Sequence, residues 1–214
     1  MNNIIRKPFR YRNYGIVYWL IGINVLIFAA MQLLGPEFRR FMMLRLSMIP
    51  ALVVHGWVWT FISYMFMHGG FRHILFNMLG LFFFGIHVER QMGSFEFLLY
   101  YLVTGFLAGV FSFVMYFLTG AHGVILLGAS GALFAVELAY AVLFPDSIIY
   151  FWGIIPLRAP VMVLGFTALE IFFSVTGMSS GVAHFTHLAG FAFGWFYFLA
   201  RFGINPWRRL IRRR

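Results

Sequence analysis

The sequence contains no cysteine and little charge. Without cysteine the chain forms no disulfide, has no thiol nucleophile and binds no zinc through thiolates. Only 10% of its 214 residues are charged, whereas about 25% are charged in an ordinary soluble domain. Hydrophobic residues make up 62%, more than one core of a chain this short can bury, because roughly a quarter to a third of its surface stays exposed. A water-soluble globule is excluded, and lipid must cover the excess.

Acidic residues are scarcer than basic ones, with 6 against 16 and a formal net charge of +10. All but one of the basic residues are Arg, and most lie near the two ends of the chain. That placement is typical of contact with anionic lipid headgroups. No basic stripe interleaved with aromatic residues follows any predicted helix, so nucleic acid is not an expected partner.

Six predominantly apolar stretches are candidate membrane spans, since crossing a bilayer takes about 20 apolar residues. They are residues 14–36, 71–88, 97–121, 127–145, 161–176 and 182–202. The first is interpreted as a retained span rather than a signal peptide, because its apolar run is too long and no A-x-A-like cleavage site follows. Residues 37–70 mix charge with amphipathic pieces, which predicts a long structured loop with helices in the interface. Residues 148–160, broken by Pro and Arg, are expected to run along the interface.

Six spans place both termini on one side of the membrane. Basic residues at the two ends outnumber the three Arg of the first loop, so the positive-inside rule assigns that side to the cytoplasm. The predicted fold is an all-α integral membrane bundle with N-in/C-in topology in the inner or plasma membrane. Its parts are a basic cytoplasmic N-terminus (1–13), a six-span domain (14–202) and a basic cytoplasmic tail (203–214).

Polar side chains gather at the outer ends of alternate spans. His73 and Asn77 fall in the first two turns of the second span, Ser130 in the first turn of the fourth, and His187 in the second turn of the sixth. At 1.5 Å per residue, all four lie roughly 5–10 Å below their helix starts, so they can share one site. Singly, each has a structural alternative: a small residue at a helix contact or a hydrogen bond across a helix pair.

Ser130 lies in Gly128-Ala129-Ser130-Gly131, where a Gly-rich loop turns into a helix. The first N–H groups of a helix are unpaired and lie at the positive end of its dipole, so they can bind an oxyanion. Acyl transfer needs a nucleophile, a base and such donors. Ser130 and His187 fit the first two roles, while the Ser130 N–H, His73 and Asn77 fit the third. No third acidic member is evident.

The sixth span also carries a small-residue face. Gly190 and Gly194 follow His187 at i+3 and i+7, a Gly-x-x-x-Gly pattern that allows another helix to approach closely. If that helix is the fourth span, His187 is carried to Ser130. Phe134, one turn below the serine, can then stack on the imidazole ring.

Three strings resemble, in order, the signature elements of the rhomboid intramembrane serine proteases. They are Arg72-His73-Ile74-Leu75-Phe76-Asn77, Gly128-Ala129-Ser130-Gly131 and His187-Leu188-Ala189-Gly190-x-x-x-Gly194. The resemblance extends from about residue 57 to 194 and is strongest to the minimal six-helix bacterial form. It implies a Ser130 nucleophile, a His187 general base and an oxyanion hole completed by His73 and Asn77. The implied supporting residues are Gly128, Gly131, Phe134, Gly190 and Gly194.

Three features depart from or exceed the family pattern. Trp59 is followed by Thr60 where the family often has Trp-Arg, so an Arg-anchored loop is not assumed. Glu137 lies about two turns below Ser130 and is interpreted as a structural hydrogen-bonding residue rather than a catalytic one. Glu89-Arg90, at the end of the second span, resembles an acidic-basic pair of the family and is interpreted as a structural cap.

Two other classes of function compete with proteolysis. A zinc site could draw on four histidines at the outer surface, although no H-E-x-x-H motif is present: His68, His73, His184 and His187. A non-catalytic rhomboid-like protein for membrane-protein binding or quality control is the other alternative, but such proteins usually lack the Ser or the His. A transporter would show discontinuous helices in paired halves, and none are visible.

The sequence therefore predicts a serine endopeptidase that cleaves membrane proteins in or beside their transmembrane helices, without cofactor or metal. Its expected partners are the lipid bilayer and helical substrates whose outer turns contain Gly, Pro or other destabilising residues; the resemblance implies small residues before the cut. Water should reach the serine from the outer face through an opening lined by polar groups, among them His73, Asn77, Ser180 and His184. Residues 178–181 contain a Gly hinge suited to a mobile cap over that opening.

Overall fold

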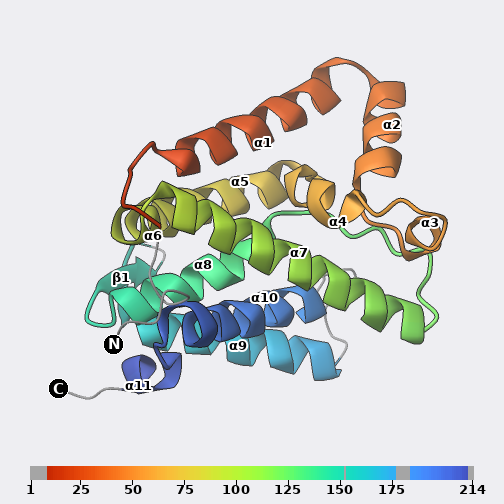
Figure 1. Ribbon diagram of the computed structural model, residues 1–214. Coiled ribbons are helices and arrows are strands. Elements are labelled where there is room, and N and C mark those ends of the chain that lie inside the picture. Colours follow the sequence, from red (N-terminus) through yellow and green to blue (C-terminus); the bar gives the residue numbers. More distant parts are fainter. Residues whose placement is uncertain (1–8, 152, 177–183, 212–214) are drawn as a thin grey trace.

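The computed structural model describes residues 9–151, 153–176 and 184–211, and most of them are helical (Figure 1). Four helices are long and apolar enough to cross a membrane, as a multi-pass membrane protein requires. They are α1 (Ile16–Leu33), a continuous helix over Phe71–Met92, α7 (Ser94–Leu118) and α9 (Ala159–Thr176). The Phe71–Met92 helix comprises α5 (Phe71–Gly80), a π-helical turn η3 (Leu81–Gly85) and α6 (Ile86–Met92). Each coincides with a predicted span.

The two remaining apolar helices are shorter. α8 (Ser130–Leu143) has 14 residues, or about 21 Å, and α10 (His184–Tyr197) continues into a π-helical turn, η4 (Phe198–Phe202), before the short α11 (Pro206–Leu210). The cap predicted at 178–181, with Ser180, lies outside the described residues. The first residue of α8, Ser130, is half-buried.

The loop after α1 is structured, as predicted. It contains α2 (Pro36–Leu46), α3 (Pro50–Val53), α4 (Thr60–Ser63) and a 3-10 turn, η2 (Tyr64–Phe66). Arg45 contacts both tryptophans of this loop: its guanidinium lies 4.8 Å from the centroid of the Trp57 ring, and its backbone carbonyl accepts a hydrogen bond from Trp59 Nε1 at 2.9 Å. The sequence comparison of Trp59-Thr60 with the family missed this arginine because it lies on α2, 14 residues before Trp59.

Residues 148–160, expected only to run along the interface, form a hairpin for which the sequence analysis assigned no strand. β1 (Ile148–Phe151) pairs antiparallel with β2 (Ile155–Arg158), with Ile148 opposite Arg158. β-branched residues favour the extended backbone at its start, and Gly153 takes φ +74° in the turn, where a side chain would be strained. This hairpin is the exception to the all-α prediction. It lies with α6, α11 and the start of α1 at one end of the bundle (Figure 1).

Glu89 caps a helix, although not its own. The first turn of α1 has no side-chain cap of its own, and the Glu89 carboxylate of α6 accepts hydrogen bonds from the N–H groups of Ile16 (2.7 Å) and Val17 (3.0 Å). The Ser94 hydroxyl donates to the same carboxylate. A negative charge at a helix N-terminus is stabilising because the unpaired N–H groups and the dipole are positive there. Glu89 thereby fastens α1 to the rest of the bundle.

α8 and α10 approach each other closely. A Cβ atom added at Gly190 would lie 1.8 Å from the carbonyl oxygen of Gly131, and one at Gly194 would lie 3.0 Å from the Cβ of Ala135. A side chain at Gly190 would therefore drive the two helices apart. The small-residue face of α10 packs against the fourth apolar segment, α8, and this contact sets the position of the candidate site.

Candidate active site

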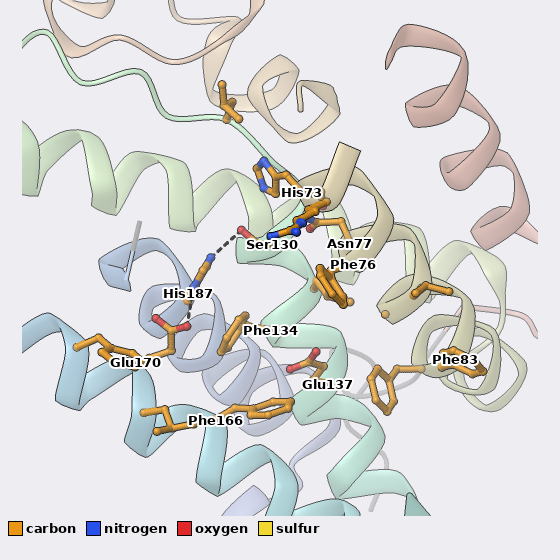
Figure 2. Close-up of a pocket in the computed structure, with 18 of the residues that line it drawn as sticks. His73, Phe76, Asn77, Phe83, Ser130, Phe134, Glu137, Phe166, Glu170 and His187 are labelled. Carbon is orange, nitrogen blue, oxygen red and sulfur yellow. Dashed lines mark hydrogen bonds and ion pairs between the residues drawn. The ribbon is translucent and has the colours of Figure 1, made fainter. Parts of the chain in front are cut away.

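Ser130 and His187 meet across the α8–α10 contact. Ser130 is the first residue of α8, and its Oγ lies 2.8 Å from Nε2 of His187 (Figure 2). The two residues are 57 positions apart in the sequence. A distance of 2.8 Å is within hydrogen-bond range for an O–H donor, so the imidazole can take a proton from the hydroxyl.

Phe134 holds the plane of the His187 imidazole. The two rings are stacked, with centroids 4.6 Å apart and an interplanar angle of 7°. Phe134 lies one turn below Ser130 on the same face of α8 (Figure 2). One face of the imidazole is therefore packed, which restricts its rotation away from the serine.

His73 lies against the loop that precedes Ser130. A Cβ atom at Gly128 would be only 2.6 Å from Nε2 of His73, and Gly128 has φ +117°, a conformation that L side chains rarely adopt. Glycine is thus required at position 128 on two counts. The loop itself is fixed from the other side, because the Gly128 N–H donates to the Tyr64 carbonyl at 2.9 Å.

Asn77 lies one turn after His73 on α5, on the side that faces Ser130 (Figure 2). Its Nδ2 donates to the His73 carbonyl at 2.8 Å, which leaves the second amide hydrogen available. Its Oδ1 is buried without a hydrogen-bond partner among the described residues. A buried amide with open hydrogen-bonding capacity beside a serine is suited to a ligand.

His68 packs against His73 from the first loop. The two rings meet edge to face with centroids 5.0 Å apart. Burial, followed by the charge of His73, lowers the pKa of His68 to about 4. His68 is therefore neutral near pH 7, and we assign it a packing role beside His73.

A carboxylate that the sequence analysis missed completes the group. Oε1 of Glu170, on α9, lies 3.0 Å from Nδ1 of His187, and Oε2 lies 2.5 Å from Nδ1 of His184. The available signal was a single acidic residue within an otherwise apolar span, which is costly unless it is paired. Its partners lie on another helix, so sequence spacing alone did not reveal them.

These side chains line one cavity of about 1050 Å³. Its walls come from α5, α8 and α9, with smaller parts from α7, α10 and the hairpin. Ser130, His187, His73, Asn77 and Glu170 all border it, and so does Glu137, which lies below Ser130 on α8 (Figure 2). Most of the remaining lining is aromatic or aliphatic, including Phe76, Phe83, Phe84, Phe166 and Phe173. The cavity can hold an apolar chain beside a few convergent polar groups.

Comparison with known proteins identifies the family. A family profile described as a rhomboid domain matches residues 55–203, well over half of the chain. The chain belongs to the rhomboid family. Rhomboid protease GluP of Bacillus subtilis is 33% identical over 125 residues, 57% of this chain and 24% of GluP. Rhomboid protease GlpG of Salmonella choleraesuis is 33% identical over 96 residues, 44% of this chain and 34% of GlpG.

A third relative matches over a longer stretch. Rhomboid-type serine protease 2 of Emericella nidulans is 35% identical over 135 residues, 63% of this chain and 25% of the relative. The chain thus spans between about a quarter and a third of the length of these three proteins. Family membership, together with the long apolar helices, identifies this rhomboid as a multi-pass membrane protein of a protease family.

The rhomboid structure brings His73, Asn77, Ser130, Phe134 and His187 to one cavity and adds Glu170; His184, expected at the opening, is not among the residues that line that cavity. Of the four histidines in the zinc hypothesis, two lie close together. The described side chains close enough to share an ion are Glu170, His184 and His187, whereas His68 and His73 are not part of that group. Any metal there would use the imidazole that contacts Ser130.

Proposed function

We propose that the chain is an intramembrane serine endopeptidase that hydrolyses peptide bonds in or next to transmembrane segments of other membrane proteins. The observation that carries the proposal is the 2.8 Å contact between Ser130 Oγ and His187 Nε2 at the wall of the cavity. The family names of the relatives support the same class of reaction.

In the proposed reaction, His187 Nε2 takes the proton of the Ser130 hydroxyl as Oγ attacks the scissile carbonyl carbon. Negative charge then develops on the carbonyl oxygen. The Ser130 N–H at the start of α8, His73 and the free Asn77 hydrogen are the proposed donors to it. His187 returns the proton to the leaving amine, and water, activated by the same imidazole, hydrolyses the acyl-enzyme.

The proposed substrates are helical membrane segments with a weakened turn. In a regular helix the scissile carbonyl is engaged in an i→i−4 bond, so it must unwind before it can reach Ser130. Gly or Pro near the cut lowers that cost. The aromatic walls of the cavity suit the apolar side chains of such a segment.

We further propose six spans with both termini in the cytoplasm, domain limits at 1–13, 14–202 and 203–214, and a site that opens to the outer face of the cell membrane. The start of α1 and the short α11 lie at the same end of the bundle (Figure 1), as an even number of crossings requires. In this proposal the shorter α8 and α10 are the fourth and sixth crossings along the chain, and the four longer helices are the others.

The direct test is labelling of the full chain in detergent with a fluorescent phosphonate, which reacts with activated serines. Wild type should be labelled and Ser130→Ala should not, while both elute as folded protein in gel filtration. Ser147→Ala is the matched control: its hydroxyl donates to the Phe144 carbonyl, away from the cavity, and labelling should persist. Labelling of Ser130→Ala would overturn the assignment of Ser130 as the nucleophile, and an unlabelled wild type would overturn the proposal and favour a non-catalytic binding protein.

A further inference from the structure

Two histidines of α10 share one carboxylate from α9. Glu170 places Oε1 at 3.0 Å from His187 Nδ1 and Oε2 at 2.5 Å from His184 Nδ1 (Figure 2 shows the His187 contact). His184 and His187 are spaced i, i+3, so both rings lie on the side of α10 that faces α9. Each carboxylate oxygen therefore has its own imidazole, and the shorter contact, to His184, fixes the orientation of the carboxylate.

The two nitrogens of the His187 ring face different groups. Nε2 faces the Ser130 hydroxyl, and Nδ1 faces Glu170. A neutral imidazole carries one proton, and a carboxylate beside Nδ1 favours the tautomer in which Nδ1 holds it. Nε2 is then left with the lone pair needed to accept the serine proton. The carboxylate also stabilises the imidazolium that forms once that proton has been taken.

The contact acts through charge rather than through a linear hydrogen bond. The Glu170 oxygen is 3.0 Å from Nδ1, yet Nδ1 has no aligned hydrogen-bond acceptor among the described residues. The oxygen must therefore lie out of line with the ring N–H. Such an electrostatic contact is weaker in orienting the ring than an aligned bond, and the stacked Phe134 ring supplies the remaining constraint.

We infer that Glu170 is a positioning residue for His187, held in place by His184, so that the catalytic pair of this rhomboid is supported by an acidic third member. The inference rests on the proposed function of Ser130 and His187. It extends that function, because Glu170 contacts neither Ser130 nor the reacting atoms and acts only through the imidazole.

The cluster of Glu170, His184 and His187 fits a metal site less well than it fits the positioning role. Glu170, His184 and His187 have ligand atoms within 4.8 Å of one another. Donor atoms on one tetrahedral zinc ion lie about 3.3 Å apart, given metal–ligand distances near 2.0 Å. The separations of 2.5 and 3.0 Å are shorter than that. Zinc would also occupy Nδ1 of His187 and leave the proton on Nε2, the wrong tautomer for a base.

The test compares Glu170→Gln with wild type, as full chains in liposomes, using a transmembrane peptide substrate with a Gly-containing turn. The glutamine side chain keeps the shape of the Glu170 side chain and removes its negative charge. We expect kcat to fall at least about tenfold and KM to change less than about twofold. The fall in kcat should be smaller than the roughly 10⁴-fold loss that follows removal of the charge from an aligned, buried triad carboxylate. The acid limb of the pH profile should move to lower pH, because the imidazolium loses its counter-charge.

Other ionisable groups around His187 must be kept constant for that pH shift to be read. They are His184 on α10, His73 on α5, Glu137 on α8 and Tyr116 on α7, and all stay unchanged in the variant. Thr167→Val is the matched control, since it removes a helix-internal hydrogen bond one turn before Glu170 and lies outside the cavity lining. Its kcat and pH profile should match those of wild type.

A purely structural role would lower the fraction of chains labelled by phosphonate without changing the labelling rate or the pH limb, and that result would overturn the inference.

If Glu170→Gln does not fold, Glu170→Asp, which keeps the charge on a shorter arm, replaces it. A kcat reduced several-fold with the wild-type acid limb supports the inference, and an unchanged kcat overturns it. Inhibition of wild type by micromolar zinc that is lost in His184→Gln would replace it with the metal site. An unlabelled wild type would overturn the proposed function itself.

Discussion

The bundle contains two groups of buried polar residues that differ in how completely they are paired. In the Glu89–Glu96 cluster, at the end where α1 begins, Glu89 accepts two backbone N–H groups and the Ser94 hydroxyl. Glu96 accepts Nε of Arg201 at 2.9 Å, its Nη2 at 3.0 Å and the Tyr197 hydroxyl at 2.5 Å. Both carboxylates are buried, and both are paired on both oxygens.

The Ser130 site is paired less completely. Oδ1 of Asn77 has no hydrogen-bond partner among the described residues, and Nδ1 of His187 has only the out-of-line contact with Glu170; both side chains border the cavity. A buried polar group left open costs free energy, and at Asn77, on the cavity wall, a ligand or an intermediate could pair with it. The contrast indicates that one cluster holds helices together while the other keeps hydrogen-bonding capacity for chemistry. Variants should therefore separate activity from stability.

The largest expected effect is loss of the catalytic pair. His187→Ala and Ser130→Ala should each reduce proteolysis at least about 10⁴-fold, because the two groups act as a unit. The double variant should be no worse than either single variant. Thermal unfolding in detergent should shift little in all three. Additive losses in the double variant would show that the two residues act independently.

Asn77→Ala comes next. Loss of one oxyanion donor reduces kcat by roughly 10²–10³, so we expect a drop of that size with KM nearly unchanged. The expected change in stability is small, because the bond that is lost runs from the side chain to the carbonyl of its own helix. Steady-state kinetics measures the effect, and an unchanged kcat would remove Asn77 from the oxyanion hole.

Gly190→Ala should affect both properties. The added methyl group would lie 1.8 Å from the Gly131 carbonyl oxygen, so α8 and α10 must separate, at a cost of about 1–3 kcal/mol in unfolding free energy. The same separation lengthens the Ser130–His187 contact and lowers kcat. Gly165→Ala on α9 is the control, since a Cβ there meets nothing within 4 Å. A stable, fully active Gly190→Ala would contradict the packing described above.

Glu89→Gln should give the smallest effect, confined to stability. Removal of the charge from the α1 N-terminus should cost about 1 kcal/mol, and activity per folded molecule should be unchanged. Glu37→Gln is the matched control. Glu37 is an acidic residue near the N-terminus of α2, in the first turn of that helix, but its side chain is exposed. The Glu37→Gln substitution should lower the free energy of unfolding by less than about 0.5 kcal/mol. Denaturant titration in mixed micelles measures both, and equal losses would contradict the capping role.

Hydrophobic length predicted the long helices well, because an apolar run of about 20 residues has few alternatives in a membrane protein. The motifs around Ser130 and His187 predicted residues that the structure does bring within 2.8 Å, since both lie near the starts of helices that run in the same direction. Those signals are local. Catalytic roles for these residues stay predictions until the kinetic tests are made.

Features that depend on contacts between distant segments were not predicted from the sequence. Glu170 contacts His187 only because α9 packs against α10, and Glu89 reaches α1 across 73 positions of sequence. The Ile148–Arg158 hairpin escaped for another reason: four-residue strands are too short for a clear period-2 pattern. In each case the local pattern indicated an unusual residue or segment, and tertiary packing decided its partner.

The capping of α1 by Glu89 has a consequence for synthesis of the protein. Synthesis proceeds from the N-terminus, so α1 is complete before α5 has been translated. The N–H groups of Ile16 and Val17 gain their acceptor only when Glu89 has emerged, and the Ser94 hydroxyl joins them five residues later. Docking of the first helix must therefore follow translation of the second long helix, although the first helix enters the membrane before it.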